Sequence, residues 1–159
     1  MAALVRQSID WIAIAPIAIS ASAASTAPPE RVFAVLADHE RWPEWFPSVS
    51  KVEVIGAAEG VGARRRVTIP GSVVEEEFIV WEPGVRWSFT GTAARPKLTR
   101  SLVEDCRLEA LGSGGTRITY TMYLDPPPLL KPLVRLATRQ VRSGIQQGME
   151  GLARRAAAS

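Results

Sequence analysis

The sequence predicts an α+β fold, with an antiparallel sheet followed by one long C-terminal helix that covers it. Apolar and polar residues alternate with a period of two through most of residues 51–125, which is the pattern of half-buried strands. Short turns rich in glycine and proline separate these segments and leave no room for crossover helices. A helical apolar stripe then occupies residues 129–156. The length of 159 residues suits a single domain, residues 1–159, with its own core.

The first strand is predicted at residues 17–25, where apolar side chains alternate with serine. Residues 1–15 form an N-terminal extension whose pattern fits either a short amphipathic helix or an extra strand. The stretch from Arg6 to Ala23 also imitates a secretory signal that ends in an Ala-Ser-Ala cleavage site. We favour the strand at residues 17–25 over the signal, because Asp10 and Pro16 are poorly placed in a signal segment.

A short helix is predicted after this strand. Ser25 and Thr26 offer a capping side chain, two prolines suit the first turn, and Glu30 is placed where the helix dipole favours an acid. Apolar residues then recur at helical spacing until about Asp38. Residues 42–47 are predicted to form one further short turn.

Six more strands and the closing helix account for the rest of the chain. The helix has an apolar stripe that includes Leu133 and Val141, and arginines and glutamines on the opposite face. A looser segment around residues 93–96 is predicted to be a connection. The predicted strands are residues 51–55, 63–69, 73–81, 85–91, 98–111 and 116–125.

Composition excludes several classes of function. The net charge of +3 is spread along the chain rather than gathered in a basic tail, so no nucleic-acid partner is expected. A single cysteine forms no intrachain disulfide, and we expect a cytoplasmic protein. One histidine without a ligand cluster predicts no metal site, no motif predicts a cofactor, and the longest apolar run is too short for a transmembrane segment.

Several short motifs, taken in order, resemble the SRPBCC superfamily, which includes START proteins, Bet v 1 and the polyketide cyclase/dehydrase and lipid-transport branch. The resemblance implies a helix-grip fold, in which a seven-stranded antiparallel sheet wraps around the C-terminal helix and two short helices follow the first strand. It also implies an apolar cavity for lipids, sterols, polyketides or quinones, with catalysis in a minority of members and no shared catalytic motif. The motifs are APPERVF at 27–33 followed by LAD at 36–38, RWPEW at 41–45, GVGA at 60–63, WEPG at 81–84 and GTRITY at 115–120.

The stretch HERWPEWFP, residues 39–47, concentrates aromatic side chains. Trp42, Trp45 and Phe46 are three and four residues apart, so they present one aromatic face to the core or to the cavity mouth. We expect this face to plug the end of the sheet, with direct stacking on a ligand as the alternative. His39 follows an acidic residue in a polar turn and is predicted to be a solvated histidine rather than a general base.

Four charged residues occupy positions that strand parity turns inward. Val67 shares its face with Arg65, Phe78 with Glu76, and Leu102 with both Arg100 and Glu104. Such charges are expected to pair or to meet a polar ligand group, because an unpaired buried charge costs several kcal/mol. Alternatively, the positions lie near strand ends, or a bulge reverses the parity, and the charges face solvent. Cys106 shares the inward parity and is predicted to be a small apolar filler.

Gly144 and Gly148 lie on or beside the apolar stripe of the closing helix, although glycine destabilises a helix interior. Two interpretations stay open. Either the glycines leave space for a ligand, or they let the helix backbone pack closely on a bulky strand residue such as Trp87 or Phe89.

The predicted function is binding or carriage of a hydrophobic small molecule (lipid, polyketide or quinone-like) in a cavity between sheet and helix. The first alternative is a cyclase/dehydrase-type enzyme with Glu104 or Glu76 as the base. The second is an interaction or regulatory protein whose cavity is filled by side chains. The sequence predicts neither the ligand's identity nor the oligomeric state. The candidate ligand-binding residues are Trp45, Arg65, Phe78, Trp87, Phe89, Arg100, Leu102, Glu104, Tyr120, Met122, Val141, Gly144, Ile145 and Gly148.

Overall fold

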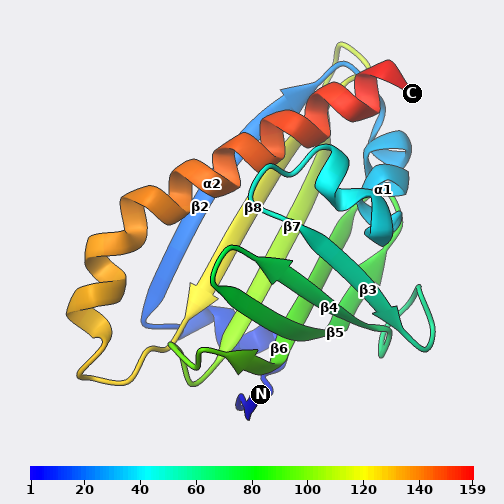
Figure 1. Cartoon of the computed structure of the whole chain (residues 1–159). Coiled ribbons are helices and arrows are strands. Elements are labelled where there is room, and N and C mark those ends of the chain that lie inside the picture. The colour runs from blue at the N-terminus through cyan, green and yellow to red at the C-terminus, as the bar shows by residue number, and fades with distance from the viewer.

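An open antiparallel sheet curves around one long helix, α2, and helix α1 lies near the end of α2 (Figure 1). The computed structural model describes all 159 residues. Along the sheet the strand order is β2-β8-β7-β6-β5-β4-β3. The predicted α+β helix-grip fold is confirmed. The elements are β1 (Ala2–Ala3), η1 (Ile9–Ala13), β2 (Ile17–Ser25), α1 (Pro29–Ala37), η2 (His39–Glu44), β3 (Lys51–Ile55), β4 (Arg64–Ile69), β5 (Ser72–Glu82), β6 (Arg86–Arg95), β7 (Leu102–Ala110), β8 (Thr116–Leu124) and α2 (Lys131–Ala158).

The strands lie where the alternation predicts them, except at the β6–β7 connection. Strand β6 continues to Arg95, so the segment around residues 93–96 is mostly strand and not a loop. Strand β7 begins only at Leu102. Pairing between β6 and β7 ends at Thr90 and Val103. Beyond this point the two strands separate, and β6 pairs with another segment.

That partner is the N-terminal extension. Ala2 and Ala3 pair with Ala94 and Ala93 of β6, and the amide of Leu4 donates to the carbonyl of Thr92 at 3.0 Å. The extension therefore fills the gap between the diverging strands and satisfies backbone groups that would otherwise be left unpaired. Of the two alternatives for residues 1–15, each is correct for one part: a two-residue strand, then the 3-10 helix η1.

Helix α1 begins without a side-chain cap. The predicted cap from Ser25 or Thr26 is wrong, because the N-cap position is Pro28. The Ser25 hydroxyl instead donates to the carbonyl of Ala153 in α2 at 2.8 Å and accepts from the amide of Ala27. This serine thus ties the end of β2 to α2.

Helix α2 packs unevenly along its length. Its second half buries Ile145, Met149 and Leu152. In its first half, Leu133 is 57% exposed, so its predicted place on the buried stripe is wrong. The outer side of the first turns thus lacks a partner, whereas Val134, at the next position, packs against the core. No helix in the structure is both long enough and apolar enough to cross a membrane.

Candidate functional site

Four inward polar side chains from four strands lie in the core of the molecule. They come from β4, β5, β7 and β8, and all four are buried. Three of them are charged residues that strand parity placed inward, so the bulge and strand-end alternative does not hold for them. The cluster consists of Arg65, Glu76, Glu104 and Tyr120.

Arg65 is buried among aromatic rings. Its Nε donates to Glu76 Oε2 at 2.6 Å, because the two residues are direct cross-strand partners in β4 and β5. The guanidinium carbon lies 4.0 Å from the Trp42 ring centroid and also faces Phe78, Trp87 and Phe89. An ion pair with aromatic faces around the cation offsets part of the cost of burying the charge. Burial raises the pKa of Glu76, and the paired guanidinium opposes that shift.

His39 belongs to this cluster, so its predicted place in a solvated loop is wrong. The side chain is only 3% exposed and stacks on Phe78 with ring centroids 5.2 Å apart. Its Nδ1 lies 3.1 Å from a guanidinium nitrogen of Arg65, and its Nε2 lies 3.0 Å from the carbonyl of Ala58. Arginine only donates, so Nδ1 accepts and the Nε2–H donates. Burial, and then the charge of Arg65, lowers the pKa of His39 to about 4.

Glu104 and Tyr120 form a second buried pair, in which the tyrosine hydroxyl donates to Glu104 Oε2. Burial, and then the neighbouring Glu76, raises the pKa of Glu104 to about 8. Burial likewise raises the pKa of Tyr120. At neutral pH the Glu104 carboxyl therefore carries its proton and can donate a hydrogen bond or transfer a proton.

Arg100 is not part of the cluster, and its predicted inward position is wrong. Its side chain is 50% exposed and pairs with Asp125 at 2.8 Å. The physical reason is the late start of β7: Arg100 lies in the irregular segment before Leu102, where strand alternation does not apply. Leu98, in the same segment, is also exposed.

The remaining predicted residues are mostly apolar parts of the core. Trp87, Phe89, Phe78, Leu102 and Ile145 are buried, whereas Met122 and Val141 are partly exposed at the border of the core. The Trp87 Nε1–H is buried without a hydrogen-bond partner. Cys106 is fully buried beside them, and burial raises its pKa, as expected for an apolar filler.

Two glycines of α2 make room for the aromatic plug, the name we give to Trp42, Trp45 and Phe46. A Cβ at Gly148 would lie 2.6 Å from the Phe46 ring, and one at Gly151 would lie 1.8 Å from the carbonyl oxygen of Trp45. Close packing therefore explains Gly148, with Phe46 as its partner rather than Trp87 or Phe89. A Cβ at Gly144 would meet no atom within 4 Å, so close packing does not explain that glycine.

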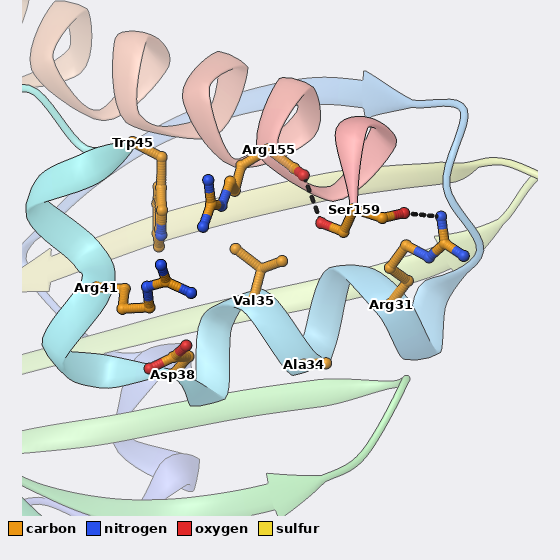
Figure 2. A pocket seen from close by; sticks show the side chains of 8 residues that line it. All are labelled: Arg31, Ala34, Val35, Asp38, Arg41, Trp45, Arg155 and Ser159. Carbon is orange, nitrogen blue, oxygen red and sulfur yellow. Dashed lines mark hydrogen bonds between the residues drawn. The ribbon is translucent and has the colours of Figure 1, made fainter.

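Two pockets open on the outside of the molecule, next to the plug. The first, of about 240 Å³, lies between α1, η2 and the end of α2, and Trp45, Arg41 and Arg155 border it (Figure 2). The second, of about 370 Å³, adjoins Trp45 on the side of Gly151. Trp45, one of the candidate ligand-binding residues, thus borders these outer pockets, and no member of the buried cluster lines either of them.

Comparison with known proteins agrees with this architecture. The family described as polyketide cyclase/dehydrase and lipid transport matches residues 16–157. The chain belongs to that family. The predicted SRPBCC relationship is confirmed. The match to the polyketide cyclase/dehydrase and lipid transport family does not include the N-terminal extension, residues 1–15.

Related sequences and solved structures support the same assignment. Uncharacterized proteins of Mycobacterium tuberculosis and Mycobacterium bovis are 36% identical over 121 residues, which cover 70% of this chain and 72% of theirs. A hypothetical protein of Helicobacter pylori superposes with a TM-score of 0.79 at 18% identity, covering 98% of this chain and 97% of that one. The Zhui aromatase/cyclase of a Streptomyces species superposes with a TM-score of 0.71 at 15% identity, covering 88% and 93%. These structural matches establish the shared fold.

Proposed function

We propose that the protein binds a hydrophobic small molecule between the sheet and the first half of α2, with its polar group at the Glu104–Tyr120 pair. The observation that carries this proposal is a buried, protonated carboxyl, with Tyr120 as its one hydrogen-bonding side chain. A neutral acid suits a keto or phenol oxygen, whereas the charge of Arg65 is already matched by Glu76.

The border of the core between β8 and α2 favours an apolar ligand. Met122 and Leu124 of β8 and Val134 and Val141 of α2 are only partly buried, although they border the core. The description of the matching family includes lipid transport, which agrees with an apolar guest. A cytoplasmic location is consistent with the single buried cysteine.

The proposal is tested by native mass spectrometry of the purified protein beside an organic extract of the same sample. A small molecule should co-purify, and Met122→Trp should reduce its occupancy by filling the border of the core. Thr121→Trp, the neighbouring position on the other face of β8, should leave occupancy unchanged. A protein that carries no molecule and takes up none from a lipid extract contradicts the proposal and favours a filled core.

A second function, cyclase/dehydrase-type catalysis, is favoured by one specific observation. A carboxyl with a pKa of about 8 beside a tyrosine hydroxyl exchanges protons readily near neutral pH. In an enzyme, Glu104→Gln should abolish turnover of a polyketide-type substrate while its Kd stays within about threefold, since the amide keeps the shape and loses the proton. Equal turnover in Glu104→Gln and the parent protein excludes this role.

A further inference from the structure

Exposed leucines mark the start of α2 and the turn before it. Leu129 is 93% exposed, Leu133 57% and Leu136 83%. Leu133 and Leu136 are three residues apart and therefore lie on the same side of the helix. Leucines this exposed gain nothing from the core, so they form an apolar strip that lacks a partner in the monomer.

A row of cations runs beside this strip. Lys131, Arg135, Arg139 and Arg142 are spaced by four, four and three residues, so they also share one side of the helix. No acidic residue occurs between Asp125 and Glu150. We call the three leucines and these four cations the leucine–arginine surface.

The cations of this surface are unpaired, unlike several arginines elsewhere in the protein. None of the four forms an ion pair, whereas Arg41 and Arg155 both pair with Glu44 and Arg66 pairs with Glu75. The surface therefore presents a positive charge that nothing within the chain neutralises. Its electrostatic complement is an anionic partner.

The position of the surface is equally informative. The strand register places the β4–β5 turn, the β6–β7 loop and the loop into α2 at one end of the sheet. Exposed Leu98 and the unpaired Lys97 lie in the β6–β7 loop, and the unpaired Arg95 is the last residue of β6. In Figure 1 this loop and the start of α2 lie at the same end as the N-terminus. Apolar and cationic residues thus continue across this end of the molecule.

We infer that the leucine–arginine surface docks the protein on a bilayer that contains anionic lipids. Side-by-side strips of leucine and unpaired arginine characterise helices that lie in a membrane interface, where the leucines enter the acyl boundary and the cations contact the headgroups. An acidic protein would neutralise the cations, but three leucines on a convex helix and loop fit a deformable acyl layer better than a preformed groove. The inference concerns the outer surface and does not depend on the proposed interior ligand.

Sedimentation of the full-length protein with vesicles tests the electrostatic part. Binding to phosphatidylcholine vesicles that contain phosphatidylglycerol should exceed binding to phosphatidylcholine alone and decrease with salt. Arg135→Glu/Arg139→Glu should weaken it by about tenfold or more, since each cation near an anionic surface contributes about fivefold. The matched control is Arg117→Glu/Arg154→Glu, which changes the net charge equally at exposed positions elsewhere and should retain at least half of the parent affinity. An equal loss in both variants overturns the inference.

A second pair of variants tests the apolar part. Leu133→Gln/Leu136→Gln should abolish vesicle binding, whereas Val61→Gln/Val85→Gln, at exposed positions at the opposite end of the sheet, should retain it. Circular dichroism confirms that each variant is folded. Absence of binding to anionic vesicles overturns the inference. So does a dimer in analytical ultracentrifugation that dissociates in the leucine variant while vesicle binding is unchanged, since a second copy then covers the surface.

Discussion

His39 is buried with both ring nitrogens engaged, and its neighbours determine its protonation. Arg65 donates to Nδ1, so a proton on that nitrogen would break the hydrogen bond and place two cations side by side. The histidine therefore acts as a neutral link between the η2 turn and β4. Its role is structural at neutral pH.

This protonation state is directly measurable, because the chain has one histidine. In a proton NMR titration, the His39 ring signal of the folded protein should shift with a midpoint near pH 4. In urea, the unfolded chain should titrate near the ordinary value of 6.5. A folded-state midpoint above 6 would contradict the Nδ1–Arg65 hydrogen bond.

The raised pKa of Glu104 makes the folded protein less stable as the pH rises. Between pH 6.5 and 8 the folded protein keeps the Glu104 proton that the unfolded chain has lost, so raising the pH lowers the free energy of unfolding. The slope should approach about 1.4 kcal/mol per pH unit and level off above pH 8. Between pH 4 and 6.5, the lowered pKa of His39 has the opposite effect, because there raising the pH increases the free energy of unfolding.

Urea denaturation at several pH values measures this slope. Glu104→Gln should reduce it, because the amide does not titrate. Glu109→Gln, at an exposed position of the same strand, should keep it. The same slope in all three proteins would mean that Glu104 is ionised in the folded state.

Strand parity alone placed Arg65, Glu76 and Glu104 in the interior, since alternation depends only on neighbours in the chain. The burial of His39 was not predictable in that way. Its partners Arg65 and Ala58 lie 26 and 19 residues away in sequence. Two sequence features were informative: the aromatic residues three to seven positions after it, and an inward arginine that needed an acceptor.

At the scale of elements, α2 combines a tightly packed half with a free half, and its glycines mark the difference. Gly148 lies against the ring of Phe46 and Gly151 against the backbone at Trp45, so the plug fixes the position of the helix. The helical stripe predicted the helix itself. It did not distinguish Leu133 from Val134, because periodicity shows which residues are apolar but not how far the sheet extends beneath them.

Alanine substitutions separate the two halves of α2. Gly148→Ala should lower the free energy of unfolding by about 1–3 kcal/mol, since the Phe46 ring leaves no room for a methyl group. Gly144→Ala should raise it by up to about 1 kcal/mol, because alanine favours a helix and the site is open. Thermal denaturation measures both. Equal effects at the two positions would show that the helix packs evenly.

At the scale of the whole molecule, the N-terminal extension completes the sheet. Its pairing with β6 explains why the boundaries of β6 and β7 differ from the predicted ones: alternation along a strand does not reveal where its partner changes. The rest of the topology followed from short turns and antiparallel order. The extension contributes one large buried side chain, Leu4.

Leu4→Ala should therefore destabilise the protein by about 2–3 kcal/mol, at the lower end of the range for truncating a buried leucine. Val5→Ala is the matched control, because this neighbour is 56% exposed and should change stability by less than about 0.5 kcal/mol. Urea denaturation measures both variants. Similar stabilities would mean that the extension is only loosely attached.

The aromatic rings around Arg65 give the protein an intrinsic optical signal. Trp42 lies 4.9 Å from Trp45 and 5.6 Å from Trp87 between ring centroids, so these indoles exchange excitation energy. Trp11 lies apart, in η1. Near-ultraviolet ellipticity and emission will therefore depend on the packing of Trp42, Trp45 and Trp87, and will register any rearrangement around Arg65 without an added dye.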